Sequence, residues 1–202
     1  MEFKDLHSQV TEFVANRVKD GKRPAVSVSW LRELIQDNVA WVNCINFYPI
    51  KELDLDDYPF GMMKTFADQD AAYNNKGAWM VAVYENTDRI KENFCWQRFV
   101  RCKEMMHIFD KDAEWVERQE QYTDLLKEIA TRPLGDKSPQ LLSEHLAQWK
   151  AILILCPLEE RNKVVASNDT DYAVALRYRI PMHYIEAIRS DSYMDAYTMF
   201  AV

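Results

Sequence analysis

One stretch of the sequence, residues 96–110, constrains the fold most, because it predicts a long amphipathic helix. Two stripes of side chains follow the 3.6-residue period of such a helix, one containing Phe99 and Met106 and the other containing Glu104 and His107. Glu104 and His107 are three positions apart, so a helix places them on the same side, where they can meet. This stretch is therefore the candidate for the centre of any functional site.

Glu104 and His107 form half of the motif His-Glu-x-x-His. In that motif two histidines on one face of a helix bind zinc, and the glutamate takes a proton from the metal-bound water. The first position of the motif is Lys103 in this chain, so the candidate base and second histidine are present and the first ligand is missing. A lone Glu-x-x-His pair also occurs on ordinary helix surfaces, and its interpretation depends on the rest of the chain.

Composition and charge limit the classes of protein that the chain can belong to. The 202 residues are 48% hydrophobic, which is enough for a sizeable core. The net charge of −7 argues against a general nucleic-acid-binding surface. The charged N-terminus lacks an apolar signal segment, and no apolar run is as long as a membrane span. The four cysteines form no Cys-x-x-Cys pair, so we expect reduced thiols in a cytoplasmic protein.

The hydrophobic patterns predict an α+β fold that is mostly helical, with a small sheet beside the central helix at residues 88–108. Strands are expected at residues 41–49 and 78–84, and loops at residues 50–64 and 68–76. Further helices are expected at residues 2–19, 28–36, 112–130, 138–155, 157–166, 170–178 and 181–190, with Ser138 and Asn168-Asp169 as caps. A tail rich in Tyr and Met closes the chain.

Several of these features occur in a characteristic order. The predicted strand at 78–84 precedes the pair Arg98-Phe99, the segment Lys103-Glu104-x-x-His107, a helix that ends in Ile154-Leu155-Cys156-Pro157, and the segment 171–181. This order resembles the ImmA/IrrE family of zinc metallopeptidases, whose central helix carries Arg-Phe-x-x-x-His-Glu-x-x-His. The resemblance covers about residues 77–190. It implies a single domain over 1–202, in which a helical and strand extension precedes the metallopeptidase-like core.

The resemblance also implies roles for individual residues. Glu104 corresponds to the general base, His107 to a metal ligand, and Glu144 on the second helix to the acidic ligand, whereas Lys103 replaces the first histidine. A catalytic zinc ion requires three protein ligands and one open position. We therefore favour a degenerate member, a pseudoenzyme without a bound cofactor, in which a buried Lys103 pairs with Glu104 or Glu144 in the place of the metal.

The second-helix site residue has an alternative in His145, which is next to Glu144. The hydrophobic pattern places His145 on an apolar helix face, where it fits a core histidine better than a metal ligand. Leu146 could also align with the glutamate of the family. The sequence leaves the choice between these positions open.

Three functions follow from these observations. The favoured one is binding of a regulatory protein partner, since phage and mobile-element members of the ImmA/IrrE family often pair with transcriptional repressors. The alternative is an active zinc-dependent endopeptidase, a hydrolase that cleaves a repressor-like protein. The third is a helix-turn-helix DNA-binding regulator built from residues 169–190. Residues 168–202 contain three arginines against five acidic residues, which suits a packing role better than phosphate binding.

Overall fold

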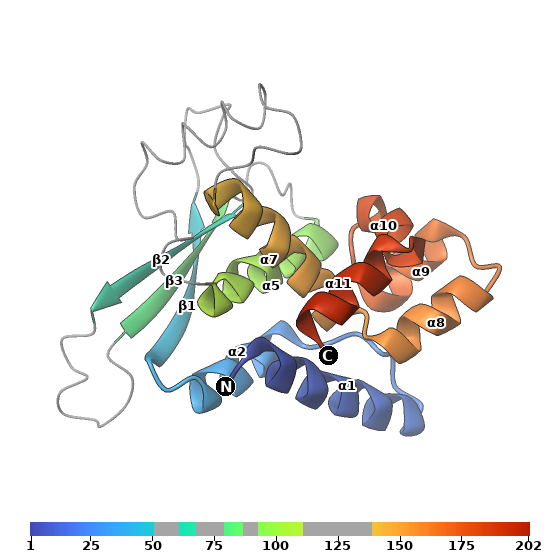
Figure 1. Cartoon of the computed structure of the whole chain (residues 1–202), viewed down its shortest axis with the longest axis horizontal. Coiled ribbons are helices and arrows are strands. Elements are labelled where there is room, and N and C mark those ends of the chain that lie inside the picture. The colour runs from blue at the N-terminus through green and yellow to red at the C-terminus, as the bar shows by residue number, and fades with distance from the viewer. Residues whose placement is uncertain (51–60, 68–78, 87–92, 111–138) are drawn as a thin grey trace.

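A small mixed β-sheet lies at one side of the structure, as Figure 1 shows. The computed structural model describes residues 1–50, 61–67, 79–86, 93–110 and 139–202. The strands are β1 (Val42–Ile50), β2 (Gly61–Ala67) and β3 (Trp79–Asn86), arranged in the order β1-β3-β2. Strand β3 is parallel to β1 and antiparallel to β2. The expected strands at 41–49 and 78–84 are thus confirmed.

The apolar composition of β3 explains its central position. Val81, Ala82 and Val83 are almost completely buried, as expected of a strand that is covered on both faces. Strand β1 contains Pro49, a residue that sheets accept mainly on edge strands. The backbone N–H of Ile45 donates to the side chain of Gln36 on the adjacent helix (2.9 Å), so a side chain pairs with this edge position.

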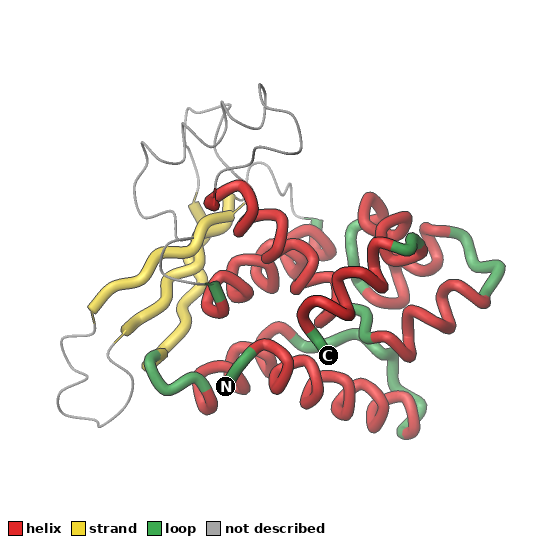
Figure 2. Tube along the Cα trace, viewed as in Figure 1, coloured by secondary structure: helices red, strands yellow, loops and turns green. Residues whose placement is uncertain are grey.

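Helices make up most of the remaining described structure, as the red segments in Figure 2 show. They are α1 (Phe3–Lys19), α2 (Val28–Asn38), α5 (Phe94–Met106), α7 (Pro139–Leu155), α8 (Leu158–Ala166), α9 (Asp171–Tyr178), α10 (Ile185–Arg189) and α11 (Ser192–Phe200), with 3-10 turns η1 (His107–Phe109) and η3 (Met182–Tyr184). The structure therefore has the predicted mostly helical α+β fold. Among the described helices, none is both long and apolar enough to cross a bilayer.

The main core lies where α5 packs against α7, between the sheet and the C-terminal helices (Figure 1). Phe99, Met105 and Met106 of α5 are buried, and the four residues from Ile152 to Leu155 of α7 have no exposed surface. The last five residues of α7, 151–155, are all apolar and buried, so this end of the helix must be surrounded by protein. Accordingly, α7 also contacts α1 and α11. This packing fixes the position of α7 relative to α5.

A buried arginine ties α5 to two distant segments. Arg98 donates hydrogen bonds to the carbonyl oxygens of Val26, Tyr178 (3.0 Å) and Arg179 (2.5 Å). Arg179 ends α9 in the left-handed conformation, with φ of 55°. Burial lowers the pKa of the Arg98 guanidinium to about 10, and the carbonyl oxygens are its hydrogen-bond acceptors. The connection before α2 and the end of α9 are thereby held against the same helix.

Some sequence-based boundaries were wrong. Residues 61–64 were expected to be loop, but they belong to β2, because pairing with β3 supplies stability that the local pattern does not show. The expected tail forms helix α11. The cap of α9 is Thr170, whose hydroxyl accepts from the N–H of Ala173 (3.3 Å), and not Asn168 or Asp169. The predicted final helix is divided into η3 and α10.

Other predictions fall outside the described residues. These are the helix at 112–130, the loop at 68–76 and residues 51–60 of the first predicted loop. The first residues of the predicted central helix and the Ser138 cap also lie outside the described ranges. The described part of the central helix begins after Asn93, whose side chain accepts from the N–H groups of Cys95 (3.1 Å) and Trp96 (3.3 Å). It ends in the 3-10 turn that follows Met106.

Candidate functional site

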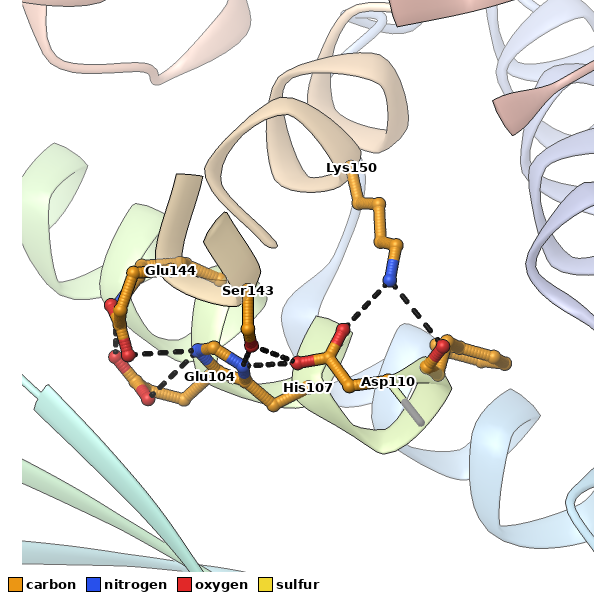
Figure 3. Close-up of polar contacts among 8 residues, drawn as sticks. Glu104, His107, Asp110, Ser143, Glu144 and Lys150 are labelled. Carbon is orange, nitrogen blue, oxygen red and sulfur yellow. Dashed lines mark hydrogen bonds and ion pairs between the residues drawn. The ribbon is translucent and has the colours of Figure 1, made fainter. Parts of the chain in front are cut away.

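The structure brings the four sequence-predicted site residues together at the contact between α5 and α7. Lys103 and Glu104 lie near the C-terminal end of α5, His107 begins the turn that follows, and Glu144 lies near the start of α7. Figure 3 shows Glu104, His107 and Glu144 converging between the two helices. Packing of α7 on α5 is what makes Glu144 a neighbour of the Glu-x-x-His pair.

The ammonium group of Lys103 contacts both glutamates. Its Nζ lies 3.0 Å from Glu104 Oε1 and 2.5 Å from Glu144 Oε2. The Lys103 side chain is 17% exposed and that of Glu104 only 3%, so both charges are largely removed from water. Burial on its own would lower the pKa of Lys103, but the two carboxylates outweigh this effect and raise the pKa above its usual value. Lys103 therefore remains a cation in this position.

Glu144 is held between two cationic groups. Burial acts to raise the pKa of the Glu144 carboxyl, but Lys103 and then His107 outweigh it and lower the pKa well below its usual range. One carboxylate oxygen contacts Lys103, while Oε1 lies 3.3 Å from His107 Nε2. Glu144 is therefore the residue through which α7 joins Lys103 to His107.

The ring of His107 is held in place by the contacts of its Nδ1 atom. Nδ1 lies 2.6 Å from Asp110 Oδ2 and 3.2 Å from the hydroxyl oxygen of Ser143. Nε2 is buried and points toward Glu144 and Glu104, without the alignment of a hydrogen bond to any described atom. Burial acts to lower the pKa of His107, but Glu144 and Asp110 raise it to about 9. The imidazole is therefore protonated at neutral pH and carries an N–H group on both ring nitrogens, with Nδ1 facing Asp110 and Nε2 facing Glu144.

Asp110 connects His107 to a second lysine. Its Oδ1 lies 2.8 Å from Lys150 Nζ, and its Oδ2 accepts from the Ser143 hydroxyl (2.5 Å). The pKa of Asp110 is lowered, because contacts with His107 and Lys150 outweigh the opposing effect of burial. Figure 3 shows Asp110 at the end of the η1 turn, facing Ser143 and Lys150 of α7. These contacts make Asp110 the anchor that fixes the ring of His107.

Sequence reasoning assigned no role to Asp110, Ser143 or Lys150. Asp110 has the same three-residue spacing from His107 that joins His107 to Glu104, and this spacing was the available signal. Ser143 and Lys150 are separated by two helical turns and so share one face of α7. Their part in the site depends on which face of α7 meets α5, and the hydrophobic pattern did not determine that.

Cations and anions alternate through the site. We call this group the α5–α7 ion cluster, and it consists of Lys103, Glu104, His107, Asp110, Glu144 and Lys150. With His107 protonated, the cluster contains three positive and three negative groups, so its charges balance. Charges this far removed from water are stable only when they are paired in this way.

Strand β2 confines Glu104 from the opposite side. A Cβ atom on Gly61 would overlap Val100 Cγ1 and would lie 3.1 Å from both Cγ and Oε1 of Glu104. Only glycine allows the strand backbone to approach α5 so closely at this point. The carboxylate of Glu104 is therefore held between β2 and α5, and it has little freedom to turn toward solvent.

The donor groups of the cluster do not match a catalytic zinc site. Zinc would require three protein ligands, and the position of the first ligand in the motif carries the ammonium of Lys103. His107 is held by Asp110 at Nδ1, as metal-bound histidines usually are, so His107 Nε2 and Glu144 remain as two protein ligands, one fewer than a catalytic zinc ion requires. In the ranges that the structure covers, no three His, Cys, Asp or Glu side chains are arranged to hold a metal ion. The residues present thus do not fit the metal that the family resemblance implies.

His145 does not take part in the cluster. Its side chain is exposed, and Nε2 accepts a hydrogen bond from the indole N–H of Trp149 (3.3 Å). The interpretation of His145 as a core histidine was wrong, because the buried face of α7 runs through Ser143, Ala147 and Lys150 instead. The residue of α7 that faces Lys103 and His107 is Glu144.

Two of the three arginines in the helix pair considered for DNA binding form ion pairs within that pair. Arg177 pairs with Asp169 (2.6 Å), and Arg189 pairs with Asp171 (3.3 Å) and also donates to the carbonyl oxygen of Asp169 (2.8 Å). Helix α10, at the position of a recognition helix, has five residues. These contacts favour a packing role for the pair.

Neither protein-family models nor curated protein sequences match this chain. The function of the α5–α7 ion cluster is therefore argued from its geometry.

Proposed function

We propose that this protein is a metallopeptidase-like pseudoenzyme of the ImmA/IrrE type that acts by binding a regulatory protein partner. The observation that supports this most strongly is the Lys103 ammonium, which lies between Glu104 and Glu144 where the motif would have its first metal ligand. In the proposal, residues about 77–190 are the metallopeptidase-like core, and the protein works in the cytoplasm of a cell that carries a phage or mobile element.

The contacts of Glu104 argue against peptide hydrolysis. A general base must be free to take a proton from the attacking water. Glu104 is 3% exposed, contacts the Lys103 ammonium and is confined by Gly61. Its lone pairs are directed to a permanent cation rather than to a substrate water. The cluster thus suits a stabilising contact between α5 and α7 better than it suits turnover.

The alternative is an active zinc-dependent endopeptidase that cleaves a repressor-like protein. One observation favours it, since His107 Nε2 is buried, lacks an aligned hydrogen-bond partner among the described atoms, and points toward both glutamates. For zinc to bind there, the Lys103 side chain would have to leave the two carboxylates. The two proposed functions therefore make different predictions for the same site, and a measurement of zinc binding distinguishes them.

The test measures zinc in the purified protein after incubation with zinc and removal of the excess. The proposal predicts well below one zinc per chain, and thermal unfolding that a chelator does not change. The alternative predicts about one zinc per chain, which His107→Ala removes and Glu104→Gln retains, with loss of peptidase activity in both variants. Glu159→Gln, at an exposed position, is the matched control for Glu104→Gln. Stoichiometric zinc would overturn the pseudoenzyme proposal.

Partner binding is tested separately by crosslinking in the native cytoplasm and mass spectrometry, followed by reconstitution with the purified partner. We expect the reconstituted complex to contain a repressor-type transcriptional regulator that stays intact. Cleavage of that regulator would favour the peptidase. The absence of any regulator that binds the purified protein would overturn the binding function.

A further inference from the structure

We infer that Glu104 and Glu144 form a binding site for a primary ammonium group, which the chain fills with its own Lys103, and that the vacated site would take up a free primary alkylammonium ion in preference to zinc. The inference depends on the geometry of the α5–α7 ion cluster and would hold even if the kinship with metallopeptidases were wrong.

The distances in the site suit an ammonium group. Lys103 Nζ lies 2.5 Å and 3.0 Å from the nearest oxygens of Glu144 and Glu104, a range that brackets charge-assisted N–H···O hydrogen bonds. Zinc–carboxylate bonds are shorter, at about 2.0–2.2 Å. An ammonium group also has three donors that rotate to meet its acceptors, so it does not require a fixed coordination geometry.

The two carboxylates would stay in place without Lys103. Glu104 is confined by the close approach of Gly61, and it lies on the buried face of α5. Glu144 is also held by His107, whose Nε2 lies 3.3 Å from its other oxygen. Because these restraints do not involve Lys103, removal of the lysine side chain leaves both acceptors converging on one position.

No other described cation replaces Lys103. Lys150, the other lysine of the cluster, contacts Asp110 (2.8 Å) and the carbonyl oxygen of Phe109 (3.4 Å). Arg101 is directed to Glu85, where its NH2 group donates to Oε2 (3.2 Å). Without Lys103, two largely buried carboxylates would face His107 alone, so the vacated position would be negative and would attract a cation from solution.

The shape of the missing side chain selects the cation. The Lys103→Ala substitution removes the outer part of a largely buried lysine stem, which corresponds in size to n-propylammonium. That ion can place its ammonium group between the carboxylates and its alkyl chain along the position of the stem. Tetramethylammonium carries the same charge but has no N–H donor, and it is therefore the matched control ion.

The experiment measures thermal unfolding of the full chain as wild type, Lys103→Ala and Lys22→Ala. Lys22 belongs to an exposed pair with Asp20, with side chains 58% and 62% exposed, so its variant controls for loss of a lysine at the surface. We expect Lys103→Ala to lower Tm by about 5–10 °C, because one partner of a largely buried ion pair is removed. Propylammonium chloride should restore at least half of this loss, by binding only the folded state.

Tetramethylammonium chloride at the same concentration, or zinc, should restore little of the lost Tm, and Lys22→Ala should respond to no ion. The inference is overturned if propylammonium has no effect, if tetramethylammonium acts equally, or if zinc restores more than propylammonium. Should Lys103→Ala fail to fold, its refolding yield in propylammonium is compared with that of the charge-free variant Lys103→Met/Glu104→Gln/Glu144→Gln. The inference then requires an improved yield for Lys103→Ala alone.

Discussion

The ammonium of Lys103 on α5 lies 2.5 Å from the carboxylate of Glu144 on α7, and this contact joins the two central helices. A double-mutant cycle with Lys103→Met and Glu144→Gln should give a coupling energy of about 1–3 kcal/mol from urea unfolding. The same cycle on the exposed pair Lys22 and Asp20 should give about 0.2–1 kcal/mol, because water screens that pair. Equal coupling in the two cycles would contradict the role given to Lys103.

His107 should make stability depend on pH on the alkaline side. Its pKa is raised from 6.5 to about 9 by Glu144 and Asp110, against the effect of burial, so the folded state binds its proton more tightly than the unfolded chain does. The resulting stabilisation is complete below about pH 6.5 and is lost as the pH rises through about 9. Unfolding free energies of wild type between pH 6 and 10 should therefore fall more steeply than those of His107→Gln.

At acidic pH, stability should change with pH in the opposite direction and fall as the pH is lowered. The pKa values of Asp110 and Glu144 are lowered in the folded state, so the stabilisation from these groups is present above their unfolded pKa and is lost as the pH falls. Together with His107, they place the maximum of stability between about pH 5 and pH 7. A wild-type stability that keeps rising up to pH 9 would contradict the protonated state of His107.

The close approach of β2 to α5 predicts a large effect of adding one methyl group. Gly61→Ala should destabilise the protein by about 2 kcal/mol, because the new Cβ overlaps Val100 Cγ1. Adding Val100→Ala should reduce the combined cost below the sum of the two single variants. The control is Gly21→Ala, where no atom lies within 4 Å and the φ of 71° alone should cost about 1 kcal/mol. Equal effects at the two glycines would show that the contact is not tight.

Substitution of Arg98 should lower the free energy of unfolding more than substitution at most other positions of α5. Arg98→Met leaves the carbonyl oxygens of Val26, Tyr178 and Arg179 without their buried donor, and it should cost about 3 kcal/mol in unfolding free energy. Arg161→Met is the matched control, since Arg161 also donates to carbonyl oxygens but is only partly buried. Its cost should be about 1 kcal/mol. A comparable cost at both positions would argue against the role of Arg98 in holding two distant segments against α5.

Elements with strong local patterns were predictable from the sequence. The amphipathic period of residues 96–110 and the apolar run at 78–84 correctly indicated α5 and β3. Strand β2 was missed because Lys64 and Thr65 interrupt its apolar residues, which therefore neither alternate nor form a continuous run, and because its pairing with β3 is a long-range contact. Helix α11 was missed even though Ser190, Asp191 and Ser192 are residues that favour a helix start. It has only nine residues, and its packing against α7 stabilises it.

The site was predictable only in part. The spacing of Glu104 and His107 indicated that the two side chains meet, whereas the choice of Glu144 over His145 depended on the rotation of α7, which tertiary packing determines. The contact between Asp110, which follows the η1 turn, and Lys150 of α7 joins residues 40 positions apart, and no local pattern predicts it. The roles of these residues in metal loss and partner binding stay predictions.

The most direct test is a crystal structure of the protein grown in the presence of zinc, with diffraction data collected at the zinc absorption edge. We predict no anomalous peak between His107 and Glu144, together with density for the Lys103 ammonium within hydrogen-bonding distance of both Glu104 and Glu144. An anomalous peak bound by His107 Nε2 and Glu144, with the Lys103 side chain turned away from both carboxylates, would contradict the replacement of the metal by an ammonium group.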